Sequence, residues 1–208
     1  MIESVNLCKN YADQNVLNSI NISLNKGEIV GLIGVNGSGK TTLLDILALI
    51  NLSSGGDIII DNEIVDNLNK KRLRSKISYV PQDIALFEEL TVKENLICWS
   101  KLNKEKTMER IMEIEPFFNL QEMFNKKITK LSGGMKKRIN IAVALMGEYD
   151  YMILDEPLAG VDYENAKMII DFLVMEKNRG VGILITGHEL NLLNEYTDRI
   201  IKLEEING

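Results

Sequence analysis

The stretch Gly34-Val35-Asn36-Gly37-Ser38-Gly39-Lys40-Thr41 decides the fold class of this 208-residue chain. Its spacing, Gly-x-x-x-x-Gly-Lys-[Ser/Thr], is typical of a phosphate-binding loop between a buried strand and a helix. Glycines let the backbone turn its N–H groups toward phosphate, and the start of the next helix favours negative charge. We expect Lys40 to meet the β and γ phosphates of a nucleotide and the Thr41 hydroxyl to ligate Mg²⁺.

The flanks of this loop have the periodicity that the motif requires. Residues 28–33 are almost entirely apolar and predict a buried strand, and alternating apolar residues over 20–24 predict an earlier one. Beyond the loop, apolar residues recur at helical spacing over 43–50, and the polar stretch 51–56 ends that helix. Strand, glycine-rich turn and helix therefore follow in order.

The rest of the chain alternates between the same two kinds of element. Residues 91–147 show helical spacing broken by charges, which predicts a helical insert. Short apolar strands are predicted at 151–154 and 181–186, separated by a helix over 165–178. This alternation is typical of a parallel sheet with crossover helices, and a final strand is predicted near 200–203.

Two adjacent carboxylates, Asp155 and Glu156, follow the apolar strand Tyr151-Met152-Ile153-Leu154. Ligands of open α/β sheets bind at the carboxyl ends of the strands. We expect Asp155 to reach a magnesium ion and Glu156 to accept a proton from the water that attacks the γ-phosphate. An Asp-Glu pair before proline is often only a solvated turn, so this interpretation depends on the phosphate loop.

A second glycine-rich helix start lies at Leu131-Ser132-Gly133-Gly134. A hydroxyl and two glycines ahead of a helix can receive an anion, although a simple N-cap explains the same residues. Because the chain already has one phosphate loop, the second helix start suggests a nucleotide shared between two copies.

Composition excludes several classes of protein. The chain has 24 Lys and Arg against 30 Asp and Glu, a formal charge of −6, so we expect no nucleic-acid partner. The longest stretch without a charged residue, residues 14–25, is too short and polar to span a membrane. The first residues show no secretory signal, and Cys8 and Cys98 are interpreted as reduced packing residues.

Taken in order, these motifs resemble the nucleotide-binding subunit of an ABC transporter, across essentially the whole chain. The resemblance implies an α/β P-loop NTPase core with a mainly parallel sheet, an N-terminal antiparallel β subdomain and an inserted helical subdomain. Residues 1–208 would form a single domain, with the nucleotide-binding core at 1–82 and 150–208 and the helical subdomain at about 83–149. No C-terminal regulatory domain is expected.

Four smaller matches fall in the family's order. Tyr11 resembles the aromatic residue that stacks on adenine, Gln82 the Q-loop glutamine, and His188 the switch histidine. Asp162 resembles the D-loop aspartate, which favours a cross-subunit role, with capping of the next helix as the alternative. Tyr11, Gln82 and His188 have structural alternatives too, as a strand residue, a turn residue and a structural histidine.

The resemblance implies ATP and Mg²⁺ as cofactors, with Glu156, His188 and Gln82 as catalytic residues and Thr41, Gln82 and Asp155 as metal ligands. Contacts to the nucleotide are expected from Tyr11, Gly34, Val35, Asn36, Gly37, Ser38, Gly39, Lys40, Thr41, Thr42, Leu131, Ser132, Gly133, Gly134 and Asp162.

The implied partners are a second ATPase cassette, identical or not, and separate transmembrane permease subunits on whose cytoplasmic face the chain docks. Met135 and Val35 depart from the family's frequent glutamine and proline. The run 131–138 resembles a branch of bacterial drug, antibiotic and peptide exporters, which favours export. An importer subunit, a cassette acting on ribosomes or DNA, and a cassette that binds ATP without hydrolysing it are the alternatives.

Overall fold

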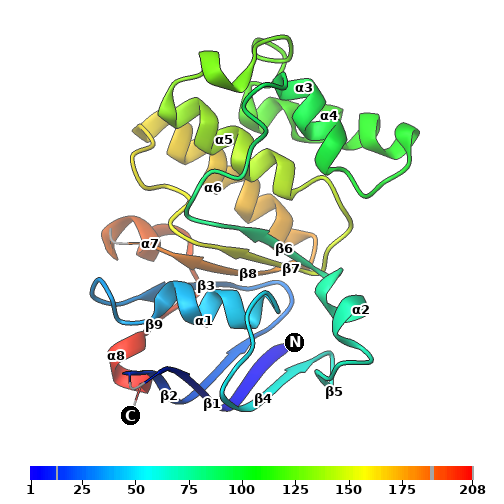
Figure 1. Cartoon of the computed structure of the whole chain (residues 1–208). Helices are drawn as coiled ribbons and strands as arrows, with labels where there is room; N and C mark the ends of the chain where they lie inside the picture. The colour runs from blue at the N-terminus through cyan, green and yellow to red at the C-terminus, as the bar shows by residue number, and fades with distance from the viewer. Residues whose placement is uncertain (13, 188–189, 208) are drawn as a thin grey trace.

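The computed structural model describes residues 1–12, 14–187 and 190–207. Its elements are stacked in layers: an antiparallel sheet, helix α1 (Lys40–Leu47), a parallel sheet and a group of helices (Figure 1). The phosphate loop predicted from the sequence joins β3 to α1, between the two sheets. The predicted α/β class, with one mainly parallel and one antiparallel sheet, is confirmed.

The parallel sheet has the strand order β6-β7-β8-β3-β9. Every neighbouring pair in it is parallel, so the carboxyl ends of its strands meet at one edge, where ligands of such sheets bind. The strands are β6 (Ile77–Val80), β7 (Tyr151–Leu154), β8 (Gly182–Thr186), β3 (Ile29–Ile33) and β9 (Arg199–Lys202).

The antiparallel sheet has the order β2-β1-β4-β5 and covers the other side of α1. Its strands are β1 (Ile2–Tyr11), β2 (Gln14–Leu24), β4 (Gly55–Ile60) and β5 (Glu63–Ile64). The sequence predicted only the second half of β2, because register shifts between β1 and its neighbours break the alternation of apolar residues. One buried apolar cluster joins this sheet to α1 and the parallel sheet.

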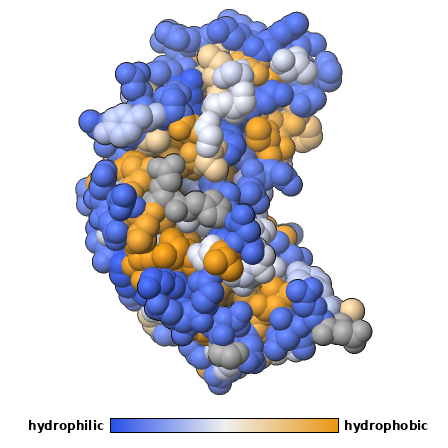
Figure 2. All heavy atoms as spheres, turned by 90° about the vertical axis from the view of Figure 1, so that its left-hand side faces the viewer, coloured by the Kyte–Doolittle hydropathy of each residue, from blue (hydrophilic) through white to orange (hydrophobic). Residues whose placement is uncertain are grey.

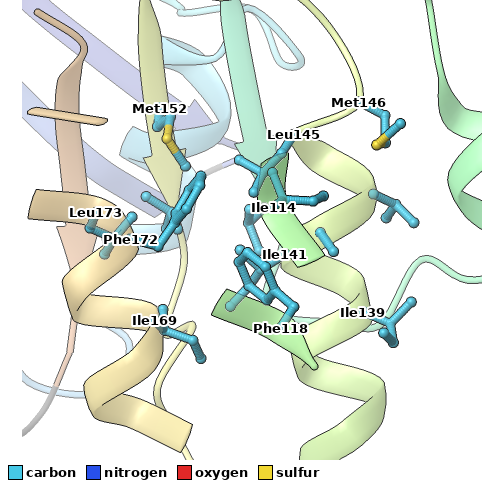
Figure 3. Close-up of a cluster of buried hydrophobic side chains, with 14 of the residues drawn as sticks. Ile114, Phe118, Ile139, Ile141, Leu145, Met146, Met152, Ile169, Phe172 and Leu173 are labelled. Carbon is cyan, nitrogen blue, oxygen red and sulfur yellow. The ribbon is translucent and has the colours of Figure 1, made fainter. Parts of the chain in front are cut away.

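The predicted helical insert consists of α3 (Val92–Trp99), α4 (Lys104–Phe118), a 3₁₀ turn at Ile128–Lys130 and α5 (Gly133–Ala144). These helices pack with α6 (Tyr163–Asn178) on the upper face of the parallel sheet (Figure 1). Their shared core includes Phe118 of α4 and Phe172 of α6 (Figure 3). The two rings pack edge to face with their centres 5.3 Å apart. The subdomain limits named above remain a prediction.

Three short helices complete the described part of the chain: α2 (Lys70–Arg74), α7 (Leu190–Tyr196) and α8 (Leu203–Ile206). Within that part, none of the helices has the length and apolar character that crossing a membrane requires.

Both cysteines are free thiols, as expected, but Cys98 is exposed on α3, so the expectation that it packs inside is wrong. Its neighbours on the buried face of α3 are Asn95 and Leu96.

Candidate functional site

Residues 34–39 connect β3 to α1, and glycine occupies the positions of this loop where φ is positive. Gly39, the N-cap of α1, has φ of 98°, a left-handed conformation that glycine adopts without steric cost. A Cβ on Gly39 would lie 3.0 Å from side-chain atoms of Val16 and Leu17. The loop is therefore pressed against β2, and only glycine fits this position without displacing that strand.

Lys40 lies almost completely inside the loop, with 6% of its surface exposed. Its ammonium group donates hydrogen bonds to the carbonyl oxygens of Gly34 (2.8 Å) and Val35 (3.1 Å). These two bonds hold a full positive charge at the base of the loop, where an anion would form a charge-assisted hydrogen bond with it.

A cavity of about 430 Å³ opens beside this lysine. It collects residues from the phosphate loop, from the segment after β6 and from the segment after β7, as the sequence predicted. Its lining residues are Val16, Asn36, Gly37, Gly39, Lys40, Thr41, Thr42, Gln82 and Glu156. Val16 was not predicted, because a surface-strand valine carries no signal of its own in the sequence.

Asp155 is buried at the end of β7, with 1% of its surface exposed. The Thr41 hydroxyl donates to its Oδ2 at 2.6 Å, which joins α1 to the second predicted motif. A hydroxyl, a carboxylate and the nearby amide of Gln82 form an oxygen donor set of the kind that suits Mg²⁺. Among the described residues no group of three or more His, Cys, Asp or Glu side chains could hold a metal. Mg²⁺ usually keeps several waters and binds through one or two carboxylates together with substrate phosphates.

Glu156 has an unusual backbone conformation for a residue with a side chain, with φ of 49°. Its N–H donates to the Thr186 hydroxyl at 2.8 Å, and its Oε2 accepts a hydrogen bond from Gln82 Nε2 at 3.1 Å. The left-handed conformation costs on the order of 1 kcal/mol or more for a non-glycine residue. It turns the carboxylate into the cavity, next to the phosphate loop.

The second glycine-rich helix start lies elsewhere. Ser132 is exposed at the N-cap of α5, where its hydroxyl accepts a hydrogen bond from Met135 N–H at 3.3 Å. A Cβ on Gly133 or Gly134 would meet no described atom within 4 Å. None of the four residues 131–134 lines the 430 Å³ cavity, so one copy of the chain does not bring the two loops together.

Asp162 is the N-cap of α6 and accepts hydrogen bonds from the N–H and the side-chain amide of Asn165. The bond from the Asn165 N–H is the main reason why the pKa of this carboxyl is lowered. The helix-capping alternative is therefore present in the structure, and a contact of Asp162 with a second copy remains a prediction.

Two further expectations have different outcomes. Tyr11 ends β1 with 47% of its surface exposed, and the Lys9 ammonium lies 4.7 Å from its ring centre. Tyr11 does not line the cavity, so its role in adenine stacking stays a prediction. His188 lies outside the described residues.

Two polar groups at the site were not predicted from the sequence. Thr186, the last residue of β8, donates to the Asp155 carboxylate and accepts the Glu156 main-chain N–H. A polar residue that ends a buried strand at the ligand-binding edge could have signalled it. Glu204 of α8 accepts a hydrogen bond from Val35 N–H, which lowers the pKa of its carboxyl. Nothing in the sequence signals a contact between residues so far apart in the chain.

Comparison with known proteins agrees with this geometry. Residues 17–159 match a protein family described as ABC transporter. The chain is 34% identical over 203 residues to the linearmycin resistance ATP-binding protein LnrL of Bacillus subtilis, covering 96% of this chain and 65% of that protein. It is 35% identical to the lipopolysaccharide export system ATP-binding protein LptB of Haemophilus influenzae, covering 96% of this chain and 85% of that protein.

Solved structures of similar fold include an ATP-binding subunit of an ABC transporter, with a TM-score of 0.89, 28% identity and coverage of 97% of this chain and 85% of the other. A dimeric bacterial ABC transporter cassette superposes with a TM-score of 0.86 at 27% identity, over 97% and 94% of the two chains. A dimeric structure of the same cassette in a post-hydrolysis state holds ADP and phosphate.

Proposed function

Because this chain belongs to the ABC transporter family of ATP-binding proteins, whose members are ATPases, we propose that it binds Mg-ATP in the 430 Å³ cavity and hydrolyses it there. The observation that carries the proposal is the junction of the phosphate loop with the two carboxylates. The Thr41–Asp155 hydrogen bond of 2.6 Å and the Gln82–Glu156 hydrogen bond of 3.1 Å place all four side chains at one edge of the sheet.

Binding would depend on the loop and on its lysine. Lys40 supplies the charge that meets the β and γ phosphates, and the N–H groups at the start of α1 point toward the same anion. Thr41, Asp155 and Gln82 would hold Mg²⁺, which neutralises negative charge on the phosphates when bound. Asp155 needs no movement of the backbone for this role, since its carboxylate already lies at the loop.

Hydrolysis would depend on Glu156, whose carboxylate accepts a proton from the attacking water. Gln82 donates to that carboxylate and so ties the segment after β6 to the proposed base. The switch histidine of the family resemblance, His188, is proposed as a second polar contact to the γ-phosphate. A cassette that only binds ATP is disfavoured, because Glu156 is present and lines the cavity.

The variant Glu156→Gln tests the proposal. An amide cannot take the proton, so ATP turnover should fall by about 10² or more while ATP binding persists. The matched control is Glu109→Gln, an exposed glutamate on α4. Wild-type turnover in Glu156→Gln would remove this residue as the base, and no ATP binding by the wild-type chain would overturn the proposed function as a whole.

We further propose that two cassettes share each nucleotide, the loop of one facing residues 131–134 of the other. Support comes from the open space that a Cβ on Gly133 or Gly134 would meet and from the dimeric cassette of similar fold. Figure 2 views the left-hand side of Figure 1, where the strands end, and hydrophobic residues gather across the middle of that face. Exposed apolar side chains in segments that follow the strands include Val35, Tyr163 and Leu190.

Transport would be carried out by separate membrane subunits docked on this chain at the cytoplasmic face of the membrane. We propose residues 83–99 as the docking segment. The rings of Phe87 and Trp99 stack there with their centres 5.7 Å apart, and each residue has more than 40% of its surface exposed. Ile84 and Ile97 are also exposed. Four exposed apolar side chains within 16 residues favour contact with another protein.

Cross-linking tests this docking segment. Both native cysteines are replaced by serine, since Cys98 is exposed inside the segment, and a single cysteine is placed at Glu88 or Glu89. Cross-links to co-expressed membrane subunits are expected at these positions and not at the control Asp57, on β4. Cross-links at Asp57 alone would contradict the docking assignment.

We propose export as the direction of transport. LnrL is a resistance protein and LptB belongs to an export system, at 34% and 35% identity. The spermidine/putrescine import ATP-binding protein PotA of Haemophilus influenzae is 32% identical, so an importer is the alternative. A neighbouring gene for a hydrophobic six-helix protein would support export, whereas a gene for a periplasmic or lipid-anchored binding protein would favour import.

A further inference from the structure

Thr186 lies at the end of β8, beside β7 on one side and β3 on the other, with 1% of its surface exposed. Its hydroxyl has one proton and two lone pairs. The proton goes to Asp155 Oδ1 at 2.7 Å, and a lone pair accepts the Glu156 N–H at 2.8 Å. A single hydroxyl therefore contacts both carboxylate residues of the proposed site.

The first of these bonds fixes the carboxylate of Asp155. Its Oδ1 is held by Thr186 and its Oδ2 by Thr41, so one hydroxyl approaches from the sheet and the other from α1. A carboxylate held at both oxygens cannot rotate about its last torsion without breaking a charge-assisted hydrogen bond. Thr186 thus fixes the orientation of the Asp155 carboxylate plane relative to the phosphate loop.

The second bond fixes the main chain of Glu156. This residue holds a left-handed conformation, and such a conformation persists only when its surroundings determine it. The Thr186 hydroxyl accepts the Glu156 N–H at this point of the chain. Loss of the acceptor would remove a partly buried hydrogen bond from the backbone that aims the Glu156 side chain toward Gln82.

We propose that Thr186 is a positioning residue for ATP hydrolysis: its hydroxyl orients the Asp155 carboxylate for the metal and the Glu156 main chain for proton transfer. This inference rests on the proposed ATPase function. Thr186 touches neither substrate nor metal in its role, and it acts through the two residues that do. Its side chain would therefore matter for turnover more than for the affinity of the nucleotide.

The test compares Thr186→Val, which keeps the shape and loses the hydroxyl, with Thr186→Ser, which keeps the hydroxyl. The matched control is Thr107→Val on α4, a threonine that is also buried and whose hydroxyl donates to the Asn103 carbonyl at 2.7 Å, away from the cavity. We expect Thr186→Val to lower kcat for ATP about 10-fold or more with KM changed less than 3-fold. Thr186→Ser and Thr107→Val should stay within 3-fold of the wild type.

A second measurement tests the hydrogen bond between the Glu156 N–H and the Thr186 hydroxyl in the absence of nucleotide. In ¹H–¹⁵N NMR of the nucleotide-free protein, amide exchange at Glu156 should be at least 10-fold faster in Thr186→Val and unchanged in Thr186→Ser. If Thr186→Val does not fold, Thr186→Ala takes its place in both measurements.

Three results would overturn the proposal. They are kcat of the valine variant within 2-fold of the wild type, a serine variant as impaired as the valine variant, or unchanged exchange at Glu156. Failure of the proposed function looks different, because the wild type would then hydrolyse no ATP while the exchange at Glu156 would still report on Thr186.

Discussion

Two glycine-rich helix starts in this protein have the same kind of sequence and opposite surroundings. At α1 the N-cap Gly39 is pressed against β2, and the next residue, Lys40, is buried and bonded to the loop's own carbonyls. At α5 the N-cap Ser132 is exposed, and the glycines that follow it face open space. The first loop is completed by its own chain, whereas the second has room for a group from outside it.

This difference predicts that the first loop acts in nucleotide binding and the second in association with a partner. Because the fold has already ordered the residues of the first loop, a single copy of the chain should bind nucleotide without help from a second copy. A loop that faces open space should affect only the step in which a partner arrives. A substitution in one loop, or in its support, should therefore leave the other loop intact.

The largest effect is expected for Lys40→Ala. Removing the cation that meets the phosphates should weaken ATP binding by about 100-fold or more, since hydrogen bonds to charged groups contribute about 1.5–3 kcal/mol each. Titration with a fluorescent ATP analogue measures it, with exposed Lys104→Ala as the control. Unchanged affinity in a folded Lys40→Ala variant would remove Lys40 from the site.

Ser132→Arg probes the other loop. In a Glu156→Gln background, Mg-ATP should shift the protein from 23.5 kDa to twice that mass in size-exclusion chromatography, because hydrolysis normally reopens the pair. A bulky arginine at position 132 should abolish the shift and leave ATP affinity of the single copy within about 3-fold. A background variant that stays monomeric at saturating ATP would count against a self-sufficient homodimer and favour a different partner cassette.

The pair Gly39→Ala and Gly133→Ala compares the two loops directly. At Gly39 a Cβ would meet β2 at 3.0 Å with a positive φ, so the free energy of unfolding should fall by about 1–3 kcal/mol. At Gly133, which has open space around it, stability should change by less than about 0.5 kcal/mol. Urea denaturation measures both, and equal losses would mean that the surroundings of the two loops do not differ in solution.

The smallest effect is expected for Glu204→Gln. The amide oxygen can still accept the Val35 N–H, while the negative charge near Lys40 is removed. ATP affinity should therefore rise, by about 2-fold to 5-fold at low salt, and the gain should shrink as salt screens the charge. Isothermal titration at two salt concentrations measures the change, with Glu205→Gln as the control. Weaker binding in Glu204→Gln would show that its charge supports the loop.

The local motifs and the elements beside them could be predicted from the sequence. The strand at 151–154 matches β7, and the helix predicted over 165–178 lies within α6. The phosphate loop, Asp155 and Glu156 were recognised because their chemistry depends on neighbours in the chain, where spacing and residue type are visible. The parallel arrangement followed from the alternation of strands and helices, and that is confirmed.

Tertiary structure alone decided which of these residues meet and what holds them. Thr41 and Asp155 are 114 positions apart, Val35 and Glu204 are 169 apart, and no periodicity in a sequence encodes either contact. The bulged strands β1 and β4 were missed for a related reason, since their pairing partners, rather than their own alternation, keep them in the sheet. A sequence reports the chemistry of a residue and its neighbours, but the distance between two residues far apart in the chain depends on how the whole core packs.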